Sequence, residues 1–160
     1  MDLSLRIAFL IATTIVSGTA FPAEETNFSG HWLDCESYQG ATVCSGYVLE
    51  QKGPRVCGAE SSFATSRQYE GYLKGEAKEG LFIATSGCGA GTGIDCPRFT
   101  AVKNRGLLLC GRSLYETGGR NISCEDASRK KTLRPYKKVS AKEYERNLGK
   151  QDWSVCSNAL

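Results

Sequence analysis

The sequence predicts an all-β fold: a small antiparallel up-and-down barrel or half-barrel of about seven to eight strands, stapled by disulfides, with a short C-terminal helix. Turn signals recur roughly every 8–12 residues between short runs rich in β-branched and aromatic residues. The chain of 160 residues contains 18 glycines and 8 cysteines, and 41% of its residues are hydrophobic and 23% charged. This composition is typical of a cross-linked globular domain and excludes a disordered chain.

Residues 1–20 have the pattern of a secretory signal peptide. Arg6 supplies the positive charge, Ile7 to Val16 form the apolar core, and Ser17-Gly18-Thr19-Ala20 provides small residues before a cleavage point. The apolar run has about half the length that a membrane-spanning helix needs. We therefore expect a secreted or periplasmic protein with no membrane span after cleavage; a retained N-terminal anchor helix is the alternative.

The clearest predicted hairpin follows the first expected strand. Phe28–Cys35 is the first expected strand, and Thr42–Gln51 and Arg55–Thr65 follow on either side of Lys52-Gly53-Pro54. A turn centred on Lys52-Gly53 places Val56 opposite Leu49. Cys44 and Cys57 then lie on the same face but several residues apart, so we expect no disulfide between them.

Two further hairpins complete the predicted sheet. Gln68–Lys74 and Leu81–Ser86 flank a loop at residues 75–80, and Arg98–Lys103 and Leu107–Tyr115 flank the tight-turn sequence Asn104-Arg105-Gly106. A final short strand is expected at Asn121–Glu125. We assign the disulfide-rich β domain to residues 21–128, and residues 129–160 to a basic segment and helix packed on the same domain.

The C-terminal segment changes character. Six basic residues fall within ten positions, namely Arg129, Lys130, Lys131, Arg134, Lys137 and Lys138. We expect a solvated linker or, alternatively, contact with an anionic surface; export argues against a nucleic-acid partner. Ser140 and Glu143 then form a capping box, and Gly149 ends the helix. Tyr144 and Leu148 share the face that we expect to pack across an open end or side of the barrel.

The cysteines predict a disulfide framework in an oxidising compartment, because their number is even and all lie beyond the predicted cleavage point. They are Cys35, Cys44, Cys57, Cys88, Cys96, Cys110, Cys124 and Cys156. Of the possible pairings we favour Cys88–Cys96, which closes a glycine-rich loop that matches neither common phosphate-binding motif. The chain has no C-x-x-C pair and a single histidine, so no metal site and no cofactor are expected.

The residues that might carry catalysis form no recognisable constellation. His31 is about 13 Å from Cys35 along the same expected strand, beyond hydrogen-bond reach, and no G-x-S-x-G sequence is present. The acidic residues are scattered, and no spacing selects a pair: Glu24, Glu25, Glu50, Glu60, Glu70, Glu76, Glu125 and Asp126. We therefore expect no enzymatic activity; a secreted hydrolase that acts through two carboxylates is the less favoured alternative.

Residues 28–86 carry a recurrent pattern. Gly30-His31-Trp32 precedes Leu49-Glu50-Gln51-Lys52-Gly53, which is followed by Gly71-Tyr72-Leu73-Lys74-Gly75. This pattern resembles small exported bacterial proteins with lipocalin-like barrels, mostly of unassigned function. The resemblance implies a barrel or half-barrel and transfers no catalytic residue.

Together these observations predict an exported, non-enzymatic binding module. A barrel mouth lined by Trp32, Tyr47, Leu49 and Phe82 would take a small apolar ligand. Alternatively, the disulfide-closed loop would present a rigid tip to a protein partner, as in a secreted inhibitor of a hydrolase.

Overall fold

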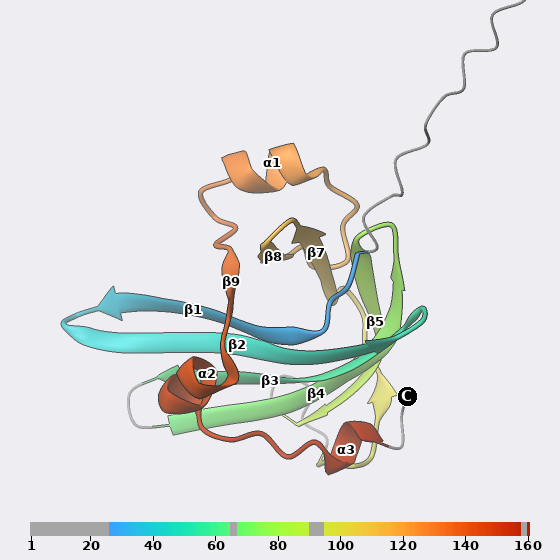
Figure 1. Ribbon diagram of the computed structural model, residues 1–160, viewed down its shortest axis with the longest axis horizontal. Helices are drawn as coiled ribbons and strands as arrows, with labels where there is room; N and C mark the ends of the chain where they lie inside the picture. The colour runs from blue at the N-terminus through green and yellow to red at the C-terminus, as the bar shows by residue number, and fades with distance from the viewer. Residues whose placement is uncertain (1–25, 65–66, 90–94, 158–159) are drawn as a thin grey trace, which may run out of the picture.

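The computed structural model describes residues 26–64, 67–89, 95–157 and 160, so the predicted signal peptide lies outside the described residues. One antiparallel sheet runs in the order β4-β3-β2-β1-β9-β8-β7-β5-β6, and β5 also pairs with β4. Eight strands therefore close into a barrel, while β6 lies beside β5 outside the ring (Figure 1). The predicted all-β barrel is confirmed. The strands are β1 (Gly30–Tyr38), β2 (Ala41–Lys52), β3 (Arg55–Ala64), β4 (Arg67–Lys78), β5 (Leu81–Gly89), β6 (Thr100–Ala101), β7 (Gly106–Cys110), β8 (Ser113–Glu116) and β9 (Tyr136–Val139).

Strands β1 to β5 form a meander in which each strand pairs with the next. At Glu79-Gly80 both residues have positive φ, 51° and 78°, which matches the twist of a two-residue hairpin turn. The predicted loop at residues 75–80 is thus wrong, and β4 continues to Lys78. The expected β2–β3 register is also wrong by two residues, because Gly53-Pro54 forms the turn and Val56 pairs with Gln51. A shift of two keeps every side chain on its predicted face.

The region after β5 departs most from expectation. The predicted strand Leu107–Tyr115 is split into β7 and β8 by a turn at Gly111, where φ is 58°. The short β6 pairs with β5 and not with β7, so the third predicted hairpin does not form. The predicted strand Asn121–Glu125 is wrong as well: α1 (Cys124–Arg129) begins there, because the Ser123 hydroxyl accepts from the Asp126 amide at the helix N-terminus.

The basic segment supplies the strand that closes the barrel, which the expectation of a solvated linker missed. Strand β9 pairs with β1 on one side, where Lys137 lies opposite Leu33, and with β8 on the other, where Tyr136 lies opposite Leu114. A short strand of this kind is hard to recognise because adjacent lysines lie on both faces, Lys137 opposite Leu33 on the outer face and Lys138 opposite Trp32 on the inner one, so charge hides the period of two.

The barrel interior is filled at one end by apolar side chains. Inward positions of every barrel strand contribute to this cluster, with Tyr136 of β9 only partly buried against it, together with Phe28 before β1. Its buried members are Phe28, Trp32, Tyr47, Leu49, Val56, Leu73, Phe82, Ala84, Leu107, Leu109 and Leu114. The interior therefore has the character of a packed core rather than an open apolar calyx.

Helix α2 (Ala141–Leu148) begins and ends as predicted. The Ser140 hydroxyl accepts from the Glu143 amide, and Gly149 caps the C-terminus with φ of 76°. The helix packs on the outer side of β1, β2 and β3 (Figure 1), and buries Tyr144 and Leu148 completely or nearly so. Gly46 allows this approach, because a Cβ there would come within 2.7 Å of the Tyr144 ring.

Four disulfides join the described segments: Cys35–Cys44, Cys57–Cys156, Cys88–Cys96 and Cys110–Cys124. The Cys88–Cys96 bridge has the pairing expected from the sequence, and Cys44 and Cys57 bond to other partners, as expected. Disulfides in this number indicate folding in an oxidising environment. Cys57–Cys156 fixes the C-terminal α3 (Ser154–Ser157) to the barrel wall. Among the described helices, none has the length and hydropathy that crossing a membrane requires.

We predict that the Cys57–Cys156 bridge stabilises the fold most. It spans 99 positions of the sequence, whereas Cys88–Cys96 spans 8. Because loop-closure entropy rises with loop length, C57A/C156A is expected to lose about 4.7 kcal/mol of unfolding free energy and C88A/C96A about 2.5 kcal/mol. Urea denaturation at neutral pH measures both. A larger loss in C88A/C96A would contradict this ranking.

Candidate functional site

Unequal strand lengths leave one end of the barrel open. Strands β1 to β4 have 9 to 12 residues, whereas β7, β8 and β9 have 4 or 5. The long strands therefore extend beyond the short ones, and their inward positions face an opening instead of a core. We call this opening the mouth. Its cavity of about 310 Å³ is lined by Ser45, Gly46, Tyr47, Glu60, Ser61, Ser62, Tyr69, Arg105, Glu116 and Tyr136.

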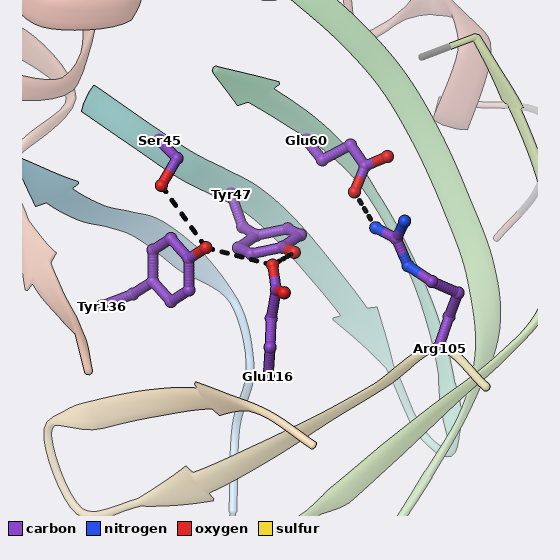
Figure 2. A network of polar contacts seen from close by, with 6 residues as sticks. All are labelled: Ser45, Tyr47, Glu60, Arg105, Glu116 and Tyr136. Carbon is purple, nitrogen blue, oxygen red and sulfur yellow. Dashed lines mark hydrogen bonds and ion pairs between the residues drawn. The ribbon is translucent and has the colours of Figure 1, made fainter. Parts of the chain in front are cut away.

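A connected polar network crosses the mouth (Figure 2). The carboxylate of Glu116, at the end of β8, accepts hydrogen bonds at one oxygen, Oε1, from two tyrosine hydroxyls. Tyr47 donates from β2, and Tyr136 donates from β9 at 3.0 Å. The Ser45 hydroxyl in turn donates to the Tyr136 hydroxyl at 3.4 Å. Three strands that are distant in the sequence are thus joined at one carboxylate.

Both tyrosines are held in their protonated form. Tyr47 is 3% exposed, and burial together with the negative charge of Glu116 raises its pKa well above the ordinary value. Burial and the same carboxylate also raise the pKa of Tyr136. At neutral pH both hydroxyls therefore act as donors, and Glu116 is their shared acceptor.

A partly buried ion pair completes the site. Arg105, just before β7, bonds to Glu60 on β3, and their side chains are 33% and 15% exposed. Desolvation raises the pKa of Glu60, and Arg105 opposes that rise. Ionising Glu60 therefore costs more free energy in the folded state than in the unfolded chain. The free energy of unfolding falls as the pH rises from the ordinary glutamate pKa through the raised one. Charges held in this way inside an opening are typical of functional sites.

A second, larger hollow of about 730 Å³ lies on the outer surface of β4, beside α3 and the segment Pro97–Phe99. Its polar groups already have partners there: the Tyr72 hydroxyl donates to the Asp152 carbonyl at 3.0 Å, and Lys74 lies over the Phe99 ring at 4.3 Å. The mouth is the stronger candidate, because its ionisable side chains line the cavity and are joined there by hydrogen bonds and an ion pair.

The structure separates the four residues predicted to line an apolar ligand site. Only Tyr47 reaches the mouth. Trp32, Leu49 and Phe82 are buried in the packed interior, where the Trp32 indole nitrogen donates to the Phe28 carbonyl at 2.9 Å. These three inward positions therefore belong to the packed cluster, and Trp32 also borders a hollow of about 230 Å³ that it shares with Leu109 and Lys138, apart from the mouth.

The other candidate residues lie away from the mouth. His31 is on the outer face against the Tyr144 ring, at 5.5 Å between centroids, and burial lowers its pKa although Glu145 opposes this effect. Glu70 borders the outer hollow, and Glu125 pairs with Arg129 on α1. Of the loop expected to present a tip to a protein partner, residues 90–94 lie outside the described residues.

The six basic residues do not form one patch. Arg134 pairs with Asp34 and Glu36 on β1. Lys137 donates to the Ser113 hydroxyl at 2.9 Å, and Lys138 lies 5.3 Å from the centre of the Trp32 ring. Arg129 pairs with Glu125, and the side chains of Lys130 and Lys131 are exposed. Of these six residues, Arg129 and Arg134 are paired with acidic side chains, and the four lysines have no ion pair among the described residues.

Sequence reasoning missed most of the network. The sequence offers no motif that selects Glu116, Ser45 or Tyr136 as site residues, and it places Arg105 only in a tight-turn sequence. A usable signal was the position of Glu116 at the end of an alternating strand, on the same face as Leu114. An acidic residue on a core-facing stripe indicates either an opening or a buried partner; here it indicates both.

The mouth is equipped for recognition by hydrogen bonds and charge. Within the described ranges, no three histidine, cysteine, aspartate or glutamate side chains come together as a metal ion would require. No protein-family model, curated protein or solved structure matches the chain. The function is therefore inferred from the geometry of the mouth alone.

We predict that Arg105→Gln raises the pKa of Glu60 further, because the guanidinium is the group that favours the ionised carboxyl. A ¹³C NMR titration of the glutamate carboxyls measures this pKa. Wild type should titrate above the ordinary glutamate value, and R105Q should titrate higher still. Lys103→Gln, at an exposed neighbouring position, is the control and should leave the value unchanged. A Glu60 pKa that stays the same or falls in R105Q would refute the assignment.

Proposed function

We propose that this protein is an exported, non-enzymatic binding module that holds a small polar ligand at the mouth of its barrel. The observation that carries the proposal is the connected network of Glu116, Tyr47 and Tyr136 around a cavity of about 310 Å³. That volume lies at the lower end of the range for small-molecule sites. Eight-stranded barrels with a filled base and an open mouth are suited to one small ligand.

The proposed ligand is polar, unlike the apolar one expected from the sequence. The apolar inward side chains lie in the core, whereas the polar groups that line the mouth are hydroxyls, carboxylates and a guanidinium. Export is supported by the disulfides and by the pattern of residues 1–20. The resemblance to lipocalin-like exported proteins fits the same proposal.

Rigidity of the walls also supports binding. The Cys35–Cys44 disulfide joins β1 to β2 directly across the pair beside the mouth, and α2 covers the outer side of the same strands. A wall that is fixed before the ligand arrives needs less ordering on binding, so more of the interaction energy appears as affinity.

A screen of small polar compounds by two-dimensional NMR tests the proposal. We expect ligands to shift amide signals of the mouth, at Ser45, Tyr47, Glu60 and Glu116. Ser62→Trp should abolish these shifts, because Ser62 lines the cavity and the indole would occupy it. The control S37W places the same side chain on an exposed position of β1, and it should bind as wild type does. Ligands that bind S62W as tightly as wild type would contradict a site at the mouth.

One observation favours a carboxylate-based hydrolase as the second candidate function. Glu60, whose pKa is raised, lines the same cavity as Glu116, and two carboxyls in unlike environments are typical of acid–base catalysis. Binding is preferred because Arg105 is bonded to Glu60 and favours its ionised form, which is unsuited to a general acid.

Chromogenic glycosides and esters distinguish the two functions. We expect wild type to release nitrophenol no faster than the double variant E60Q/E116Q, since no turnover is proposed. A rate that is present in wild type and lost in the double variant would establish the hydrolase and overturn the binding proposal.

A further inference from the structure

The charge at the mouth is not balanced. Among the residues that line the cavity, Glu60 and Glu116 are acidic and Arg105 is basic. Arg105 bonds to Glu60, and among the described ion pairs none includes Glu116. Arg105 is near enough to Glu116 to feel its charge but does not neutralise it by contact. One carboxylate at the mouth is therefore left without a bonded cation.

The hydrogen bonds at the mouth also leave Glu116 able to accept from a ligand. The Tyr47 and Tyr136 hydroxyls donate to Glu116, Ser45 donates to Tyr136, and Arg105 donates to Glu60. Each hydroxyl has one proton to give, so the Tyr47, Tyr136 and Ser45 hydroxyls have committed theirs within the protein, while Arg105 keeps N–H groups beyond its bond to Glu60. Beside Glu116 the capacity that remains is that of an acceptor, Oε2, which complements a ligand that brings its own N–H donors.

The aromatic rings around Glu116 add a second contribution. The rings of Tyr47 and Tyr136 meet edge to face, with centroids 5.1 Å apart and planes at 75°. Tyr69, 47% exposed, stands at the rim of the same cavity. Ring faces attract cations, and this attraction is stronger where water is partly excluded. An anion, in contrast, would approach both an unneutralised carboxylate and the negative faces of the rings.

From these contacts we propose that the mouth binds a small organic cation, whose ammonium group is held by Glu116 beside the rings of Tyr47 and Tyr136. This inference rests on the proposed binding function and specifies its ligand class. A cavity of about 310 Å³ has room for the equivalent of about ten water molecules. It therefore fits a short alkyl or benzyl ammonium and excludes a long polymer from full burial.

Three molecules of nearly equal size test the proposal: n-butylammonium, 1-butanol and butyrate, titrated into wild type and followed by two-dimensional NMR. We expect n-butylammonium to shift the mouth amides at the lowest concentration. Glu116→Gln should weaken its binding by about tenfold or more, because a charge-assisted hydrogen bond becomes a neutral one. Glu79→Gln removes an exposed carboxylate at the β4–β5 turn and should leave the affinity unchanged.

The outcomes separate this inference from the function on which it rests. Preference for butyrate or butanol at the mouth would overturn the cation and leave the binding function in place. Binding of n-butylammonium that is equal in wild type and E116Q would overturn the role of Glu116. If none of the three molecules shifts the mouth signals, the proposed function fails together with the inference. The spectrum of E116Q itself shows whether the variant is folded.

Discussion

Backbone hydrogen bonding between β9 and its two neighbours closes a ring that the other barrel strands leave open. Without β9, the edges of β1 and β8 would be unpaired, and exposed edges invite association with other chains. The same four-residue strand also brings Tyr136 to Glu116 and Ser45. Closure of the barrel and assembly of the candidate site are therefore a single event, produced by a segment whose charge alone suggests a linker.

The contrast between long and short strands decides where the barrel is core and where it is site. Around Trp32 and Phe82 all strands are present, and the interior is filled by apolar side chains. Beyond the ends of β8 and β9 only the longer strands continue, so their inward positions face water and carry polar groups. Glu60, which is partly buried, and Glu116, which is exposed, lie at this boundary, where each is bonded to a neighbour and can meet a ligand. The packed apolar cluster stabilises the fold, so the mouth can carry polar side chains that contribute little to the core.

Features that depend on neighbouring residues were predicted correctly from the sequence, whereas the pairing of distant strands was not. The capping of α2 by Ser140 and Gly149 follows from a few adjacent residues, and the all-β class follows from the repeated turns. The split between β7 and β8 depended on the backbone conformation at Gly111, which sequence does not state. Glu116 and Tyr136 meet only because β8 and β9 are neighbours in the sheet, and a single sequence contains no record of which strands pair.

Amide hydrogen exchange across β9 tests the central claim most directly, because the claim is that this basic segment is a barrel strand and thereby part of the site. The account predicts that the amides of Lys137 and Val139 that bond to β1 or β8 exchange as slowly as those of the paired β1 residues. Exchange of all β9 amides as fast as at the exposed Thr132, with the rest of the barrel still protected, would show that the ring is open and would contradict the account.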